Sequence, residues 1–217
     1  MGYTSYIELI DRTLLEGKEI VSTGMRKEID RCRIAIKNAE SGKYTVIVSS
    51  GDPGIYGMAG LVLELMIKEG IIDKVDIEII PGVPALCAAS SLLGAPLMHD
   101  FAVISLSDLM TPWELIKKRI LASLEGDFVI ALYNPRSKRR RWQLSEALKL
   151  IMEKRGKDVP VGIVKNATRQ GEVVLIKRIG EVEKIVDMID MTTILIVGNS
   201  KTAIYRNLMI TPRGYKV

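Results

Sequence analysis

Short apolar runs alternate along the chain with segments of helical spacing. Four runs are rich in β-branched residues and predict buried strands: residues 44–48 ("YTVIV"), 75–80 ("VDIEII"), 101–106 ("FAVISL") and 128–133 ("FVIALY"). Helices are predicted at residues 6–15, 25–42 and 58–70. In the second of these, Ile29, Cys32 and Ile36 share one face and Gly42 follows as a stop. This alternation predicts βαβ units with a mostly parallel sheet.

The last third of the chain has a different spacing. Three apolar runs lie close together there: residues 159–164, 171–179 and 192–197. Short connections favour mixed, partly antiparallel pairing. The sequence therefore predicts an α/β protein of two domains, residues 1–106 with a mostly parallel sheet and residues 107–217 with a mixed sheet. At the junction, "SLSDLMTPWE", we expect Thr111 to cap a helix and Pro112 to occupy its first turn.

Composition narrows the chemistry. The 217 residues carry a net charge of +5, and they include one histidine and two widely spaced cysteines. These counts argue against a metal cluster and a disulfide scaffold, and they favour a reducing compartment. Charged residues interrupt every apolar run before the roughly 18 residues that a membrane span requires. With no signal-peptide pattern at the start, we expect a cytoplasmic protein without a membrane partner.

Two glycine- and proline-rich loops follow predicted strands. The first is "SSGDPGIYG" at residues 49–57, and the second opens "PGVPALCAASSLLGAP" at residues 81–96. Glycines at the carboxyl end of a strand allow the backbone to approach a ligand closely. Neither loop is a GxGxxG or P-loop motif, so dinucleotide and nucleotide-phosphate binding lose their main support. An ordinary strand-to-helix turn is the alternative for each loop.

Taken together, four blocks resemble the tetrapyrrole methyltransferases of corrin biosynthesis. They are "SSGDPGIYGMAG", "IIPGVPALCAASSLLGAPLMHDFAVISLSDLMTPWE", "FVIALYNPRSKRRRWQL" and "KNATRQGE". The resemblance spans nearly the whole chain, and it is strongest to members that methylate C-17 of a cobalt-precorrin-3-type tetrapyrrole while the ring contracts. It implies a two-domain fold with S-adenosylmethionine in a cleft between the domains, an anionic tetrapyrrole as substrate, no nucleic acid as partner, and a homodimer.

The resemblance also implies cofactor-binding positions. They are Gly51, Asp52, Pro53, Ile55, Pro84, Ala85, Tyr133, Asn134, Ala167, Thr192 and Thr193. A neutral adenine and a sulfonium need backbone polar groups and apolar walls more than strongly charged side chains. This set, in which Asp52 is the only charged residue, fits that requirement.

Proton transfer and substrate binding have separate candidates. His99 and Asp100 are the candidate acid and base for the proton movements of ring contraction. A structural hydrogen-bonding role is the alternative for His99. The substrate-binding candidates are Asp108, Thr111, Arg136, Arg139 and Arg140.

The basic run carries a further expectation. A helix is expected to begin at Asn134, with Pro135 in its first turn, or at Ser137. The arginines then lie at the positive end of its dipole, where substrate carboxylates would offset the repulsion. The alternative is a solvated basic turn.

The start of the chain differs from the family pattern, and the sequence also allows other functions. Members of the family normally begin with a strand and a GxGPG-type loop, so we expect about thirty residues of the pattern to be missing before "MGYTSYIEL". Other functions also remain: methylation of another corrin position, of a sirohaem precursor or of the diphthamide precursor. The basic "RSKRRRWQ" with its tryptophan leaves a nucleic-acid-binding module as a weaker alternative.

Overall fold

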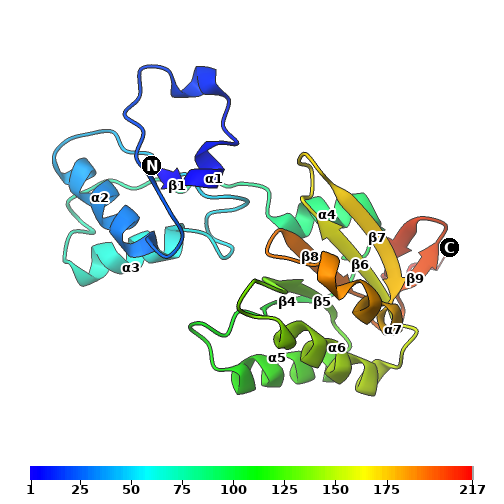
Figure 1. Ribbon diagram of the computed structural model, residues 1–217. Helices are drawn as coiled ribbons and strands as arrows, with labels where there is room; N and C mark the ends of the chain where they lie inside the picture. Colours follow the sequence, from blue (N-terminus) through cyan, green and yellow to red (C-terminus); the bar gives the residue numbers. More distant parts are fainter. Residues whose placement is uncertain (217) are drawn as a thin grey trace. The chain divides into compact units, whose positions relative to one another are not determined.

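The computed structural model describes residues 1–216, which form two compact units, Met1–Pro84 and the part of the chain from Ala85 onward (Figure 1). This division differs from the domain boundary predicted at residues 106 and 107. Residues 85–106 belong to the second unit because their strand, β4 (Phe101–Ser105), pairs with β5 (Val129–Tyr133), and their helix, α4 (Ala85–Leu93), packs on the same sheet.

The first unit is built around two helices. Its elements are β1 (Gly2–Tyr3), α1 (Thr4–Ile7), the 3₁₀ helix η1 (Arg12–Leu15), β2 (Ser22–Thr23), α2 (Glu28–Glu40) and α3 (Ala59–Lys68). The predicted helices at 25–42 and 58–70 are thus confirmed as α2 and α3. Their apolar faces form a small core with Cys32, Ile36, Val62, Leu65, Met66 and Ile71. The predicted helix at 6–15 is broken, because the Asp11 side chain accepts the Thr13 N–H at 2.9 Å and starts η1.

The predicted strands at 44–48 and 75–80 do not form ladders. In the first, only Val48 bridges to Gly2, and its N–H donates to the Met1 carbonyl at 2.7 Å. Apolar side chains therefore remain exposed, among them Tyr44 at 93% and Ile80 at 67%. An extended run becomes a strand only beside a hydrogen-bonding neighbour. Parallel pairing in this unit is real but confined to β1, β2 and that one bridge.

The second unit contains the mixed sheet that the sequence predicts. Its five strands lie in the order β4-β5-β8-β6-β7, with β6 at Pro160–Lys165, β7 at Val173–Arg178 and β8 at Thr193–Val197. β4 and β5 are parallel, and the other pairs are antiparallel. A second sheet joins β3 (Gly94–Ala95), β10 (Leu208–Ile210) and β9 (Ala203–Tyr205).

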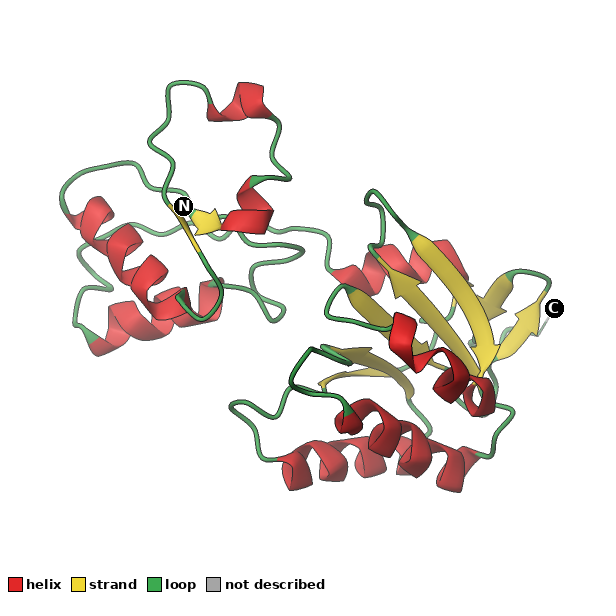
Figure 2. Cartoon of the chain, viewed as in Figure 1, coloured by secondary structure: helices red, strands yellow, loops and turns green. Residues whose placement is uncertain are grey.

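Helices cover both faces of the five-stranded sheet (Figure 2). One face packs against α5 (Trp113–Glu125), α6 (Trp142–Arg155), α7 (Ile179–Val182) and the 3₁₀ helix η2 (Glu183–Met188). The other packs against α4, whose Leu93 is fully buried over Gly162 of β6. The helix start predicted at Thr111 is one residue early, since Pro112 is the N-cap of α5. Its fixed φ suits that position.

The side chain of Arg155 lies at the end of the sheet where β5 begins and β8 ends, and it links the segments there. The Arg155 guanidinium donates to the carbonyls of Gly198 and Phe128, both at 2.8 Å, and lies 3.5 Å from the Asp127 carboxylate. Burial lowers the pKa of Arg155, and the charge of Asp127 opposes that shift. These contacts join the end of α6 to the segment before β5 and to the segment after β8.

The packing of Leu93 on Gly162 generates a stability prediction. A Cβ at Gly162 would overlap the Leu93 side chain. Gly162→Ala is therefore expected to lower the free energy of unfolding by about 1–3 kcal/mol through overpacking. The matched control is Gly60→Ala on α3, where a Cβ meets nothing within 4 Å and better helix propensity should raise stability by about 0.5–1 kcal/mol. Urea denaturation followed by circular dichroism measures both, and equal stability of the two variants would contradict the prediction.

Candidate functional site

In the first unit, the Asp52 carboxylate holds two loops together. Its Oδ1 accepts the Gly54 N–H at 2.8 Å, and its Oδ2 accepts the Gly82 N–H at 3.1 Å. These hydrogen bonds, that from Gly82 first, lower the pKa of Asp52. The predicted cofactor residues Gly51, Asp52 and Pro53 therefore lie beside the segment that leads to Pro84.

The glycines of these loops have a structural reason. Gly51 has a φ of +75°, in the left-handed region that favours glycine. A Cβ at Gly82 would overlap the Gly51 carbonyl oxygen. Close approach of backbone to backbone thus accounts for these two positions without a ligand. Gly54 differs, since it is exposed and a Cβ there would meet only the Asp52 Oδ1, at 3.2 Å. Next to it Ile55 is 40% exposed.

In the second unit, β5 and β6 end and β8 begins at the same end of the five-stranded sheet. We call this end of the sheet the strand-end edge. β6 pairs with β8 so that Lys165 lies opposite Thr193, and the Asn166 N–H donates to the Thr192 carbonyl at 3.0 Å. β8 pairs on its other side with β5, with Leu132 opposite Leu195. The carboxyl ends of β5 and β6 therefore meet the start of β8. Five predicted cofactor residues gather at this edge: Tyr133, Asn134, Ala167, Thr192 and Thr193.

Tyr133 also fixes the start of α4. Its hydroxyl oxygen accepts the Leu86 N–H at 2.8 Å, and so satisfies one of the donors that a helix N-terminus leaves without an intrahelical partner. Ala85, the first residue of α4, lies beside this contact. Asn134 has a φ of +51°, and its amide donates to the Ser105 hydroxyl at 3.0 Å.

A carboxylate that the sequence reasoning missed organises the start of β8. Asp190 accepts the Thr192 N–H at 2.9 Å and the Thr192 hydroxyl at 2.7 Å, and it pairs with the Lys165 ammonium at 2.6 Å. Burial acts to raise the pKa of Asp190, but the hydrogen bonds from Lys165 and Thr192 outweigh it and lower the pKa. The Asp-x-Thr spacing, typical of a side chain that bonds two residues on, is the signal that could have identified it.

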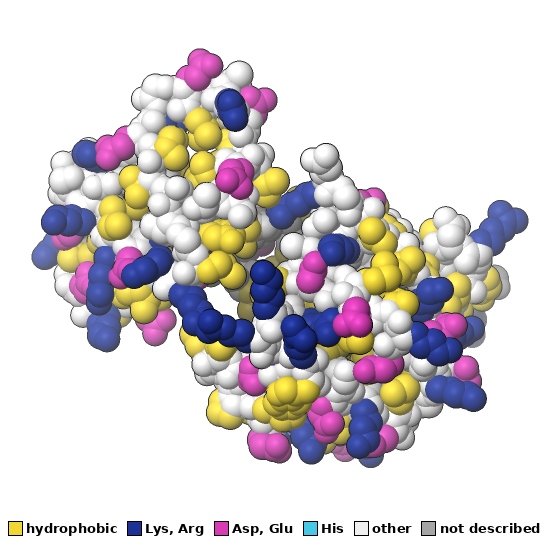
Figure 3. All heavy atoms as spheres, viewed as in Figure 1, with side chains coloured by type: hydrophobic (Ala, Val, Ile, Leu, Met, Phe, Trp, Pro, Cys, Tyr) yellow, Lys and Arg dark blue, Asp and Glu magenta, His cyan; other side chains and the backbone are white. Residues whose placement is uncertain are grey.

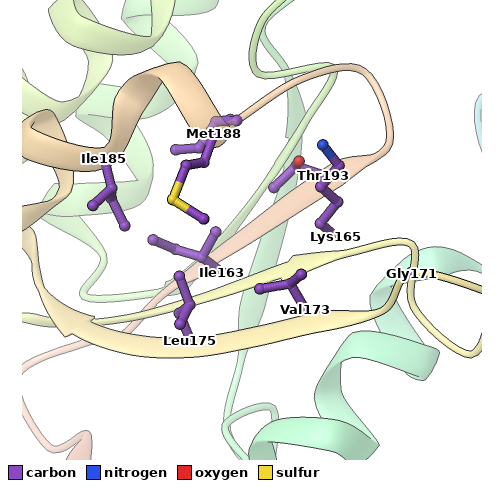
Figure 4. Close-up of a pocket in the computed structure, with 9 residues that line it drawn as sticks. Ile163, Lys165, Gly171, Val173, Leu175, Ile185, Met188 and Thr193 are labelled. Atoms are coloured by element: carbon purple, nitrogen blue, oxygen red, sulfur yellow. The ribbon is translucent and has the colours of Figure 1, made fainter.

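An apolar cavity of about 310 Å³ opens beside this network. Ile185 and Met188 come from η2, and they face Ile163 and Leu175 of the sheet across the cavity (Figure 4). Lys165 and Thr193 lie at one side of it. The cavity thus combines apolar walls with a polar side, as a flat heteroaromatic ring requires.

The structure corrects the expectation for the basic run. The helix begins at Trp142 with Arg141 as N-cap, so neither Asn134 nor Ser137 starts it. Residues 134–141 form a loop instead, because Asn134 has a positive φ and Ser137 and Arg140 exchange backbone hydrogen bonds. This loop separates most of the basic residues from the helix dipole.

The three predicted substrate arginines lie in different environments. Arg140 is only 6% exposed and donates to the Leu106 carbonyl at 2.9 Å and to the Asn134 carbonyl. Arg136 pairs with Asp187 at 2.9 Å and donates to the Val186 carbonyl at 2.9 Å. Arg139 is exposed, as are Lys138 and Arg141.

A groove of about 450 Å³ runs beside the basic loop. It is lined by Arg136, Ser137, Lys138, Arg141, Asp187, Ile189, Asp190, Met191 and Thr192. On the face of the molecule that Figure 3 shows, basic and acidic side chains are interspersed.

The remaining candidates also belong to the second unit. His99 and Asp100 are exposed, and the Asp100 N–H donates to His99 Nδ1 at 2.8 Å. Asp108 is partly buried and accepts from the Gln143 amide at 2.8 Å. Thr111 lies three residues further along the same connection and is partly exposed.

No helix within residues 1–216 is long and apolar enough to cross a membrane. In that same span, no three His, Cys, Asp or Glu side chains group as metal ligands would.

Comparison with known proteins is consistent across sequence and structure. A family model described as "Tetrapyrrole (Corrin/Porphyrin) Methylases" matches residues 7–183. The "Cobalt-factor III methyltransferase" of Priestia megaterium is 49% identical over all of this chain, which spans 40% of that protein. The "Probable cobalt-factor III C(17)-methyltransferase" of Salmonella typhimurium is 48% identical over 99% of this chain and 87% of its own length. The crystal structure of the methyltransferase CobJ matches with a TM-score of 0.90 and 34% identity, over 97% of this chain and 87% of that one.

The Asp52 contacts generate a pH prediction. Because its folded pKa is lowered, Asp52 stabilises the loops above its unfolded pKa of about 3.9, and that contribution is lost as pH falls through the lower folded pKa. The amide resonances of Gly54 and Gly82 should therefore titrate together, with a midpoint below about 3.9. Two-dimensional NMR of the wild type and of Asp52→Asn tests this. Separate midpoints, or the same titration in Asp52→Asn, would show that Asp52 does not hold the loops.

Proposed function

The chain belongs to the tetrapyrrole (corrin/porphyrin) methylase family, and from this premise we propose that it methylates C-17 of a cobalt-precorrin-3-type tetrapyrrole, with ring contraction, in cobalamin biosynthesis. One observation carries the proposal: 48% identity that extends over 99% of this chain and 87% of the Salmonella relative. Other positions of the corrin ring, sirohaem precursors and the diphthamide precursor are the alternatives, and no observation on this chain favours them.

S-adenosylmethionine is the proposed methyl donor. When bound it supplies an electrophilic methyl group on a sulfonium. Two sets of residues fit such a group: the loop of Gly51, Asp52, Pro53 and Ile55, and the strand-end edge with Tyr133, Ala167 and Thr193. The first offers exposed backbone near a carboxylate. In the second, Thr193 lines the apolar cavity together with Lys165, whereas Tyr133 and Ala167 pack on the α4 side of the sheet. Ala85 and Pro84 join the two sets along the chain.

The chemistry asks these residues mainly to position the reactants. Methyl transfer from a sulfonium is an in-line displacement, and alignment of donor and acceptor can supply much of the rate. Both sets suit that task, because their backbones are fixed by Asp52 in one unit and by Asp190 in the other.

We assign the proton movements of ring contraction to His99 and Asp100. Because Nδ1 of His99 accepts the Asp100 N–H, the neutral ring carries its proton on Nε2, which is then the donor. The Asp100 side chain is 81% exposed, so water and a substrate can reach it.

Substrate carboxylates are assigned to the exposed part of the basic loop. Arg139 keeps its proposed role, and Lys138 and Arg141 join it, because these side chains are exposed and the latter two line the groove. Arg136 lies in the same groove beside Asp187, whereas Arg140 is buried and supports the loop. A cytoplasmic homodimer that binds neither nucleic acid nor membrane completes the proposal.

An activity measurement tests the function. Anaerobic incubation with S-adenosylmethionine and cobalt-precorrin-3 should give a product heavier by one methyl group, detected by mass spectrometry.

Gly54→Leu should weaken binding of S-adenosylmethionine about tenfold or more by filling the space beside Asp52, while thermal stability stays unchanged. Gly60→Leu, exposed on α3, is the matched control. Calorimetry showing equal affinity for both variants would remove the loop from the cofactor site.

The basic loop gives a second test. Lys138→Ala combined with Arg139→Ala should weaken tetrapyrrole binding about tenfold, with unchanged stability and unchanged S-adenosylmethionine affinity. Arg140→Ala should instead lower the free energy of unfolding by about 1–3 kcal/mol, since it leaves buried carbonyls unsatisfied. Tight binding of duplex DNA with a steep salt dependence would reopen the nucleic-acid alternative.

A further inference from the structure

The connection between β4 and α5 carries two adjacent, strongly exposed apolar side chains. Leu109 is 76% exposed and Met110 is 97% exposed. Scattered single apolar side chains are normal on a protein surface, but neighbouring ones indicate a binding surface. The first residue of α6, Trp142, is 53% exposed, and it contributes a third large apolar surface near them.

Both ends of this connection are fixed. At its start, the Leu106 N–H donates to the Tyr133 carbonyl at 2.9 Å, and the Leu106 carbonyl accepts from Arg140 at 2.9 Å. At its end, the ring of Trp113 packs edge-on against that of Trp142, with 4.9 Å between the ring centroids. Leu109 and Met110 are therefore exposed on a loop whose two ends are held in place.

Asp108 and Gln143 fix the connection from within. The Gln143 side chain is 3% exposed and donates to Asp108 Oδ2 at 2.8 Å. Asp108, the residue before Leu109, thus lies directly beside the first turn of α6. Leu109, Met110, Trp113 and Trp142 form what we call the apolar patch.

Cations flank the apolar patch on one side. Lys138, Arg139 and Arg141 are exposed and lead directly into Trp142. Lys138 and Arg141 also line the groove of about 450 Å³, so the cationic surface continues from the patch into a hollow. An apolar centre with a basic border complements a ligand that has flat apolar faces and carboxylates at its edge.

We propose that the apolar patch binds one face of the tetrapyrrole macrocycle, while Lys138, Arg139 and Arg141 bind its peripheral carboxylates. This rests on the proposed function, and it adds Leu109, Met110 and Trp142 as substrate-positioning residues, none of which the sequence assigned to the substrate. A membrane surface or a second copy of the chain would satisfy the apolar side chains as well, but neither needs a hollow beside the cations.

The test uses the intrinsic fluorescence of the protein. The chain has two tryptophans, and both, Trp113 and Trp142, lie in the apolar patch. The probe is uroporphyrin III, a macrocycle with carboxylates at its edge whose absorption overlaps tryptophan emission. It should quench the fluorescence of the wild type saturably, and citrate, which has carboxylates without a macrocycle, should not. Trp113→Phe should retain the quenching, because Trp142 alone then reports it.

Leu109→Asn combined with Met110→Gln is expected to raise the Kd for uroporphyrin III about tenfold and to leave the calorimetric Kd for S-adenosylmethionine unchanged. The matched control is Leu14→Asn with Met25→Gln, which changes the same residue types at 64% and 62% exposure in the first unit. Its uroporphyrin Kd should equal that of the wild type. Circular dichroism establishes that both variants are folded.

Each contrary result has a distinct meaning. Equal uroporphyrin Kd values in both variants overturn the proposed surface, while methyl transfer by the wild type keeps the proposed function. Wild-type protein that binds no tetrapyrrole and transfers no methyl group overturns both. A blue shift of the tryptophan emission with phosphatidylserine vesicles, without saturable quenching by uroporphyrin III, makes the patch a membrane contact. A dimer that Leu109→Asn with Met110→Gln dissociates makes it an interface between copies.

Discussion

The antiparallel pairing of β8 with both β5 and β6 is the constraint on which the second unit depends. All five residues of β8 are buried, so its register cannot slip by one residue without turning its side chains to the opposite faces of the sheet. That pairing brings the carboxyl ends of β5 and β6 to the start of β8. Tyr133, Lys165 and Thr193 meet at one edge for this reason.

Carboxylates then fix the backbone where the strands end. Asp190 holds the start of β8, Asp108 accepts a hydrogen bond from Gln143 in the first turn of α6, and Asp52 joins the two loops of the first unit. In each case an acidic side chain bonds backbone N–H groups or a neighbouring side chain. These hydrogen bonds pre-organise the loops, and the apolar and cationic side chains beside the loops remain available to bind a ligand.

The sequence predicts elements best where periodicity and burial agree. The runs at 101–106 and 128–133 became β4 and β5, because each has a ladder partner and a helix above it. The runs at 44–48 and 75–80 look similar, but within residues 1–216 the first makes a single bridge, from Val48 to Gly2 of β1, and the second pairs with no strand, so composition alone misled. The site was harder. Arg140 and Arg139 are adjacent in sequence, yet one is buried among carbonyls and the other is exposed. Only tertiary contacts distinguish them.

Arg155 lies at the edge of the sheet away from these loops, where it joins the connections before β5 and after β8. Much of the polar anchoring of the sheet is therefore independent of the residues that would meet a substrate. A chain built this way can exchange the loops at one edge while the opposite edge maintains the strand order. New substrate preferences could then arise by loop replacement within a single inherited scaffold.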